Sequence, residues 1–248
     1  MTNRMAHILT PRLVLARPQI GENIGSIARL QANFGIPELC IVAPIEGWQH
    51  GAHRTASMCR GLLDEARILH DLDEALADCS HIHGFTARSG SDRLVEDVHA
   101  GLGPALQMAS EPGQKLAFVF GNEESGLSSE ETARCTRLFT LPLPGLSSLN
   151  LSHAVAIVLA QWQRSSQPEA SSRPPARGRH PLLDLEGKQR LSTHVRDRLG
   201  TLGFAVDDPH FDGMLRRLVE SAEIETRDAR ILHKILRHLD WLQDPDTR

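Results

Sequence analysis

Short strand-like runs alternate with helical segments over the first 163 residues, and this alternation restricts the fold more than any other feature of the sequence. Apolar runs such as RLVLAR at 12–17, ELCIVAP at 38–44 and KLAFVFG at 115–121 are separated by stretches with apolar residues at helical spacing. Strands that alternate with helices form parallel sheets covered by helices. The sequence therefore predicts an α/β domain with a parallel sheet over residues 1–164.

A different pattern begins after Trp162. The segment RSSQPEASSRPPARGRHP is polar and rich in proline, which disfavours both helix and strand, and it predicts a flexible linker over residues 165–181. Beyond the linker, apolar residues recur at spacings of three and four, as they do in amphipathic helices. Residues 182–248 are therefore expected to form a small all-helical C-terminal domain.

Composition excludes several classes of protein. The chain is 40% hydrophobic and 23% charged, which is typical of a globular protein. It has no apolar run long enough to cross a membrane and no signal-like N-terminus, so no membrane association and a cytoplasmic location are expected. The net charge of −4 disfavours a protein that coats nucleic acid indiscriminately, although a local basic patch can still bind RNA.

No metal site is predicted. The four cysteines are dispersed and show neither zinc-site nor disulfide spacing. His81 and His83 alternate on a predicted strand and so share one face, but no third ligand is evident, which favours buried histidines over a metal pair.

Capping signals mark the ends of several predicted helices. Asn23 is interpreted as the N-cap of the first helix and Gly35 as the glycine that ends it. Ser128 or Ser129 is expected to cap a later helix. Asp73 and Glu74 fall near another predicted helix start and are interpreted as a solvated first turn.

Three loops follow predicted strands, at the edge of the sheet where α/β proteins bind their ligands. They are PQIGENIGSIAR at 18–29, GNEESGLS at 121–128 and LPLPGLSSLN at 141–150. The first loop matches neither a dinucleotide fingerprint nor a Walker A sequence, so a conventional nucleotide site is disfavoured. Taken singly, the second loop is consistent with a simple turn and the third with helix capping.

Taken together, NIGSIAR, FGNEESGL and SLNLSHAVAIVL resemble, in order, the three signature motifs of the SpoU branch of the SPOUT methyltransferases. FTARSG at 85–90 and MLRRLVESAEIETRDARILHKILRHL in the tail extend the resemblance to the tRNA-methylating members of this branch. The resemblance implies a parallel sheet closed by a trefoil knot, and a homodimer whose sites are completed across the two subunits. It further implies ribose 2'-O-methylation of RNA with S-adenosylmethionine and without a metal.

The same resemblance assigns residues to roles. The catalytic residues it implies are Arg29, Ser148, Asn150 and Glu123. The cofactor-binding residues it implies are Phe85, Thr86, Ala87, Gly121, Leu141, Ser147, Ser148 and Leu149. The RNA-binding residues it implies are Asn23, Arg29 and Arg88. Because an arginine is always protonated and is a poor general base, Arg29 is expected to position the substrate.

The resemblance implies that the substrate is tRNA, at nucleotide 32 of the anticodon loop. Alternatives are methylation of ribosomal RNA or of another tRNA position, since signature motifs report the reaction more than the substrate. A catalytically inactive RNA-binding relative is a further alternative, but such a protein would be expected to lose Arg29 or the SLN stretch, and both are present. A nucleotide-binding regulator is disfavoured by the missing phosphate loop.

Overall fold

The computed structural model describes residues 9–88, 94–145, 148–166 and 180–243, and its centre is a sheet of seven strands in the order β3-β2-β1-β6-β4-β7-β5. Every pairing between neighbouring strands is parallel, as the sequence predicted. The strands are β1 (Arg12–Ala16), β2 (Leu39–Val42), β3 (Arg67–Leu69), β4 (His81–Phe85), β5 (Val95–Asp97), β6 (Leu116–Phe120) and β7 (Arg137–Thr140).

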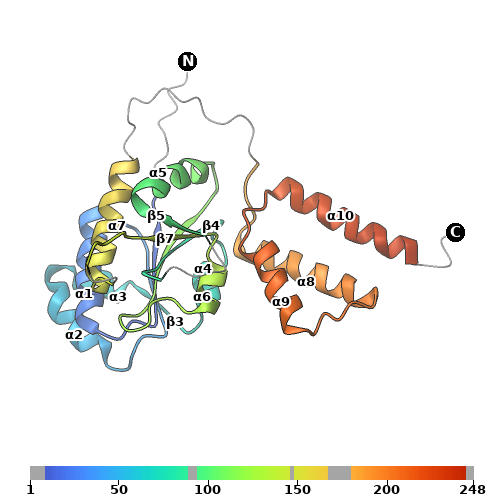
Figure 1. Cartoon of the computed structure of the whole chain (residues 1–248). Helices are drawn as coiled ribbons and strands as arrows, with labels where there is room; N and C mark the ends of the chain where they lie inside the picture. The colour runs from blue at the N-terminus through green and yellow to red at the C-terminus, as the bar shows by residue number, and fades with distance from the viewer. Residues whose placement is uncertain (1–8, 89–93, 146–147, 167–179, 244–248) are drawn as a thin grey trace, which may run out of the picture.

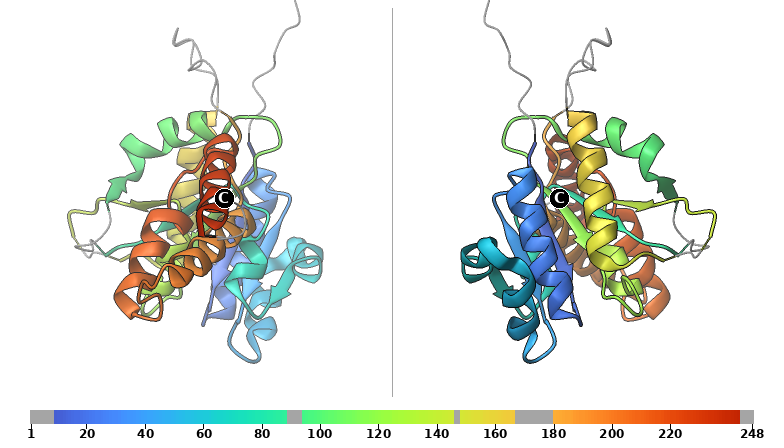
Figure 2. Two further views of the ribbon diagram at one scale, coloured as in Figure 1. Left: turned by 90° about the vertical axis from the view of Figure 1, so that its right-hand side faces the viewer. Right: turned by 90° about the vertical axis from the view of Figure 1, so that its left-hand side faces the viewer.

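Helices cover both faces of the sheet, and each strand therefore feeds two hydrophobic cores (Figure 1). In β1, Leu13 and Leu15 enter one core while Val14 and Ala16 enter the other. Burial on both sides explains why the strand sequences are continuously apolar. The helices that contribute to the first core are α1 (Gly21–Phe34), α2 (Trp48–Ala56), α3 (Arg60–Asp64), α5 (Val98–Ala109) and α7 (Leu151–Ser166). Figure 2 shows α1 and α7 side by side on this face.

The opposite core is covered by short helices and by the C-terminal tail. The short helices are α4 (Leu72–Leu76) and α6 (Ser129–Arg134). Asp71 caps α4, with Asp73 and Glu74 in its first turn. Ser128 caps α6 in a capping box with Glu131, which confirms the first of the two caps considered.

Helix α1 ends as expected at Gly35, but its predicted start was wrong. Gly35 has a φ of 63° and its amide bonds back to the carbonyls of Ala32 and Gln31. At the other end the N-cap position is Ile20, and Asn23 lies inside the first turn, where it is buried. Asn23 is turned to other partners, described below, which no capping pattern could indicate.

The tail is helical, as the sequence predicted. It comprises α8 (Leu185–Thr201), α9 (Pro209–Leu215), a π-helical turn (Arg216–Glu220) and α10 (Thr226–Gln243). Its own small core contains Leu191, Leu215, Val219, Ala229 and Leu236. Of the predicted linker at 165–181, residues 165 and 166 complete α7 and residues 167–179 lie outside the described part of the chain.

The tail is docked on the sheet domain (Figure 1). Leu185 is fully buried in the second core of the sheet, and its amide donates to the carbonyl of Cys79 at 3.1 Å. Arg137 of β7 reaches Glu223 in the tail at 2.6 Å, and Arg134 of α6 reaches Glu220 at 3.3 Å. Among the described residues, no helix combines the length and the hydropathy needed to span a bilayer.

Candidate functional site

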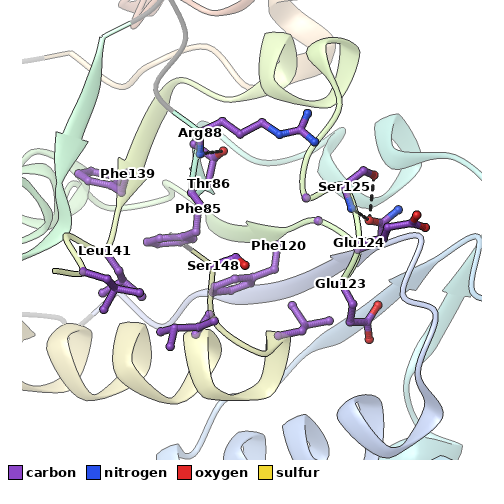
Figure 3. Close-up of a pocket in the computed structure, with 18 residues that line it drawn as sticks. Phe85, Thr86, Arg88, Phe120, Glu123, Glu124, Ser125, Phe139, Leu141 and Ser148 are labelled. Carbon is purple, nitrogen blue, oxygen red and sulfur yellow. Dashed lines mark hydrogen bonds between the residues drawn. The ribbon is translucent and has the colours of Figure 1, made fainter. Parts of the chain in front are cut away.

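A cavity of about 280 Å³ opens at the carboxyl ends of β6, β4 and β7, three neighbouring strands of the sheet. The segments at the ends of these strands, at 85–88, 120–126, 139–143 and 148–149, form its walls together with the start of α7 (Figure 3). This is the edge at which parallel α/β sheets bind their ligands. The second and third signature motifs both contribute to the cavity wall.

Aromatic rings form one part of the wall. Phe85 stacks on Phe120, with ring centroids 4.8 Å apart, and on Phe139 at 5.8 Å. The chain has only seven phenylalanines and no tyrosine, and three of these phenylalanines line the cavity. The remaining wall includes polar side chains, among them Thr86 and Ser148 (Figure 3). Apolar surface with a few polar groups is typical of a pocket for a small molecule.

The structure brings together the residues that the family resemblance implied for the cofactor. Those that line the cavity are Phe85, Thr86, Ala87, Gly121, Leu141, Ser148 and Leu149. The remaining one, Ser147, lies outside the described residues. Arg88 and Glu123 also line the cavity, while Asn23, Arg29 and Asn150 do not.

A chain of hydrogen bonds joins the three motif loops through Glu123, Asn23 and Asn150. Glu123 Oε1 accepts from Asn23 Nδ2 at 2.7 Å and from the Ile20 amide at 3.2 Å, and Oε2 accepts from the Gln19 amide at 2.8 Å. Asn23 Oδ1 in turn accepts from Asn150 Nδ2 at 2.9 Å. One carboxylate and two amides thus connect segments about a hundred residues apart. We call these three residues the motif relay.

The side chains of the motif relay bond to one another and to backbone amides, which is not the arrangement expected of residues that act directly on a substrate. Glu123 is turned from the aromatic wall toward the start of α1 (Figure 3). Asn23 is only 5% exposed and lies within the first turn of α1. Asn150 also caps α7, since its Oδ1 accepts from the amide of Ser152 at 2.9 Å. The geometry favours these residues as supports of the loops that form the cavity.

Arg29 has a different environment. It lies about two turns into α1 and its side chain is exposed. Within the described part of the chain, Arg29 makes no hydrogen bond or ion pair. The guanidinium is available to a ligand or to a second protein chain.

Gly121, which the resemblance implied for the cofactor, lines the cavity and is also closely approached by the chain itself. A Cβ at Gly121 would lie 2.0 Å from the carbonyl carbon of Gly126, so a side chain there is excluded. Asn122 closes the same turn, with Oδ1 accepting from the amide of Ser125 at 2.6 Å and from its hydroxyl at 2.9 Å. Asn122 thereby forms the turn that shapes this wall.

Arg17 was missed by the sequence analysis. Its backbone has a φ of 53° directly after β1, and its side chain donates to both carboxylate oxygens of Glu131, at 2.6 and 2.8 Å, and to the Gly126 carbonyl at 3.2 Å. Burial opposes the charge of Glu131, but hydrogen bonds from Arg17 and Ser128 keep its pKa below the usual value. Arg17 thereby holds the second motif loop. The one feature of the sequence that could have indicated this role is an arginine directly after an apolar strand.

His81 and His83 are buried in β4, at 1% and 0% exposure. Burial lowers the pKa of His81 to about 4 and that of His83 well below its usual value, so both are neutral near neutral pH. The ring of His83 stacks on Phe118 with centroids 6.0 Å apart. Among the residues that the structure describes, no three histidine, cysteine or acidic side chains are grouped as metal ligands would be.

Comparison with known proteins identifies the family to which the chain is similar. Residues 10–160 match the model of the SpoU rRNA Methylase family. The tRNA (cytidine/uridine-2'-O-)-methyltransferase TrmJ of Escherichia coli K12 is 31% identical over 242 residues, which cover 92% of this chain and 94% of the relative.

Solved structures show the same fold. The crystal structure of TrmJ from Z. mobilis ZM4 has a TM-score of 0.75 at 29% identity, over 93% of this chain and 99% of that one. An AdoMet-bound rRNA methyltransferase from Sinorhizobium meliloti shares the fold at a TM-score of 0.51 and 18% identity, over 64% of this chain and 57% of that one. Because the family model covers more than half of the sequence and a relative is similar along nearly its whole length, the chain belongs to the SpoU rRNA Methylase family.

Proposed function

We propose that this protein transfers a methyl group from S-adenosylmethionine to a ribose 2'-oxygen of tRNA, at nucleotide 32 of the anticodon loop. The observation that carries the proposal is the convergence of the three motif loops, two on one cavity and all three joined by the motif relay. The named relatives support tRNA as the substrate, because their similarity includes the tail as well as the sheet domain.

The cavity fits the cofactor by its chemistry. The stacked rings of Phe85 and Phe120 offer apolar surface to a planar base or an alkyl chain, and Thr86 and Ser148 offer hydroxyls to polar groups. When bound there, S-adenosylmethionine supplies an electrophilic methyl carbon on a sulfonium. No glycine fingerprint is required, because loop backbone from three strand ends surrounds the space.

The chain's own contribution is orientation. The 2'-oxygen must lie in line with the methyl carbon, and holding two reactants in such a geometry supplies much of the rate enhancement. Arg29 positions the substrate by binding a phosphate next to the reacting ribose, for which its planar guanidinium is suited. Arg88 adds a second phosphate contact at the rim. The 2'-hydroxyl proton leaves to a phosphate oxygen or to water, since Arg29 stays protonated.

A homodimer forms part of the proposal. Arg29 is exposed on α1 and Ile157 is 38% exposed on the neighbouring α7, which gives this face both an apolar contact and a free cation for the site of a second copy. The trefoil knot also belongs to the proposal. Its support is the insertion of β7 between β4 and β5, followed by the return of α7 to α1. A cytoplasmic location, where tRNA substrates are available, is expected with it.

The test is transfer of a labelled methyl group from S-adenosylmethionine to an unmodified tRNA transcript with a pyrimidine at nucleotide 32, after the protein has been treated with a chelator. The product is mapped by nucleotide. A matched transcript with a purine at 32 and a ribosomal RNA fragment serve as comparison substrates. Methylation elsewhere in the tRNA refutes the position, methylation of the ribosomal fragment alone refutes the substrate, and a strict need for an added divalent ion refutes metal-free catalysis.

A further inference from the structure

A pair of histidines lies where α8 and α10 meet in the tail. The Nδ1 atoms of His194 and His233 are 2.7 Å apart, and the rings stack with centroids 5.0 Å apart. At this distance one Nδ1 carries a proton and the other accepts it. The neutral pair therefore presents one donor and one acceptor at its two Nε2 atoms. A single added proton makes both Nε2 atoms donors, and a second would force the rings apart.

Beside this pair lies a cavity of about 430 Å³, which is lined by His194, Arg230, His233 and Arg237. Each of these four residues is a cation or becomes one by taking up a proton, and no carboxylate is found in the lining among the side chains that the structure describes. Among the side chains that the structure describes, Arg230 and Arg237 form no ion pair. Other arginines of the tail do, as Arg196 does with Asp212 and Arg227 with Asp228. The described lining of the cavity thus carries positive charge and no counter-charge.

The charged groups around His233 also indicate a site for an anion. Its pKa is lowered by burial, then by His194, and then by Arg237 on its own helix and Arg190 on α8. The charge of Arg190 is offset by Glu186, which lies 2.5 Å from it. Among the described side chains, the charge of Arg237 has no such partner. An anion in the cavity would offset the repulsion by these cations and favour the charged form of the pair.

We propose that the cavity between α8 and α10 binds a phosphodiester of the RNA backbone, with Arg230 and Arg237 facing its oxygens and the His194–His233 pair taking up one proton from solvent as the phosphate enters. This proposal rests on the proposed function, in that the ligand is the RNA substrate. Phosphate oxygens accept from guanidinium and imidazolium donors alike, and such contacts supply sequence-independent affinity and register on the nucleic acid.

The proton makes this phosphate contact dependent on pH. A phosphodiester does not change its charge between about pH 6 and about pH 8, so any change in affinity over that range that involves the pair reports its protonation. Binding of the full-length protein to unmodified tRNA should tighten by roughly two- to five-fold as the pH falls, the strength of one exposed charge pair. Sulfate, an anion that likewise keeps its charge in this range, should raise the pKa of His233 as measured by NMR of labelled histidine.

Matched variants separate this site from general electrostatics. His233→Gln keeps a polar side chain without the titration, and it should abolish the pH-dependent part of tRNA binding, whereas His210→Gln on α9 should retain it. Arg230→Ala and Arg237→Ala should each lower the slope of log affinity against log salt by about one, the value for one lost phosphate contact. Arg227→Ala, on the same helix but beside Asp228, should leave that slope unchanged.

The outcomes distinguish this proposal from the proposed function. If the wild-type protein methylates tRNA while Arg230→Ala, Arg237→Ala and His233→Gln bind it with unchanged salt and pH dependence, the phosphate site is refuted and the enzyme activity stands. If no methylation is found but these variants weaken RNA binding as described, the site stands without the activity. If Arg230→Ala changes the oligomeric state and leaves RNA affinity unchanged, the cavity serves a protein contact and the proposal is overturned.

Discussion

At the scale of single residues, nothing in the described fold depends on the side chain of Arg29. It is exposed and unpaired there, whereas Asn23 in the same motif is buried and hydrogen bonded. Removal of the Arg29 guanidinium should therefore leave the fold intact while affecting the reaction.

We expect Arg29→Ala to retain the melting temperature and cofactor affinity of the wild type and to lose methyl transfer. Loss of one charge-assisted contact made in the transition state costs on the order of 2 to 4 kcal/mol, or roughly thirty-fold to a thousand-fold in rate. Arg29→Lys should not restore the rate, because lysine lacks the planar fork. Arg164→Ala, an exposed arginine on α7, is the control. Turnover of Arg29→Ala at the wild-type rate would refute the assignment.

The buried histidines of β4 make acid stability a second property set by single residues. Below about pH 6.5 the unfolded chain binds protons at His81 and His83, but the native chain does not, because the pKa of His81 is lowered to about 4 and that of His83 falls well below its usual value. Stability is present above the unfolded pKa and is lost as the pH falls toward 4. His81 accounts for on the order of 3 kcal/mol of this loss.

Replacement of one ring by an apolar ring tests this account. His83→Phe should reduce the pH dependence of the free energy of unfolding between about pH 6.5 and 4, because phenylalanine fits between Phe118 and Phe139 and cannot take up a proton. Urea unfolding at fixed protein concentration measures it, with the exposed His50→Phe as control. An unchanged pH dependence in His83→Phe would show that this ring is not the source.

Residue-level features were the least predictable from sequence. The cofactor residues were implied by the family resemblance, and those that the structure describes line the cavity. The partners of Asn23 were not, since its capping signal is the same whether the side chain bonds its own helix or a distant carboxylate. Lys188 is fully buried with its amino group unpartnered within the described structure, which no surface-like helical pattern indicates.

At the scale of elements, the motif relay makes the loops of the site depend on one another. The Glu123 carboxylate accepts two backbone amides before α1 and the Asn23 amide. A carboxylate that accepts several donors in this way leaves them unsatisfied when it is altered, which costs more than the bond itself contributes.

Glu123→Gln places an amide group where only acceptors are needed. We expect a loss of about 1 to 3 kcal/mol in the free energy of unfolding and a weaker affinity for S-adenosylmethionine, since the 121–126 loop forms one cavity wall. Glu124→Gln is the matched control, because Glu124 lines the same cavity and is exposed. Calorimetry measures both quantities. Equal behaviour of the two variants would mean that the relay does not support the site.

Elements were predicted well where periodicity was long and poorly at their ends. The alternation of strands and helices and the helical tail are confirmed, because burial on two faces and amphipathic spacing both leave a direct trace in the sequence. The docking of the tail was not predicted. It depends on contacts such as Leu185 with the second core and Arg137 with Glu223, which join residues far apart in sequence and follow no period.

At the scale of the whole molecule, α1 and α7 lie side by side on the face opposite the tail (Figure 2). We expect the full-length protein to be a homodimer through this face. Light scattering over a range of concentrations measures the mass, and Ile157→Glu should shift it toward the monomer by placing a charge at the centre of the contact. A monomeric wild type, or a variant with unchanged mass, would contradict this arrangement.

The order of the strands also determines when the chain can fold. The inner strand β1 lies between β2 and β6, and Arg12 pairs in register with Ala117, 105 residues later. At a synthesis rate of about 5 to 20 residues per second, β1 emerges roughly 5 to 20 seconds before its central partner exists. During that interval the edge of β1 that will pair with β6 is open to chaperones or to other nascent chains. Of the seven strands, β1 is thus made first, but its edge toward β6 is paired late.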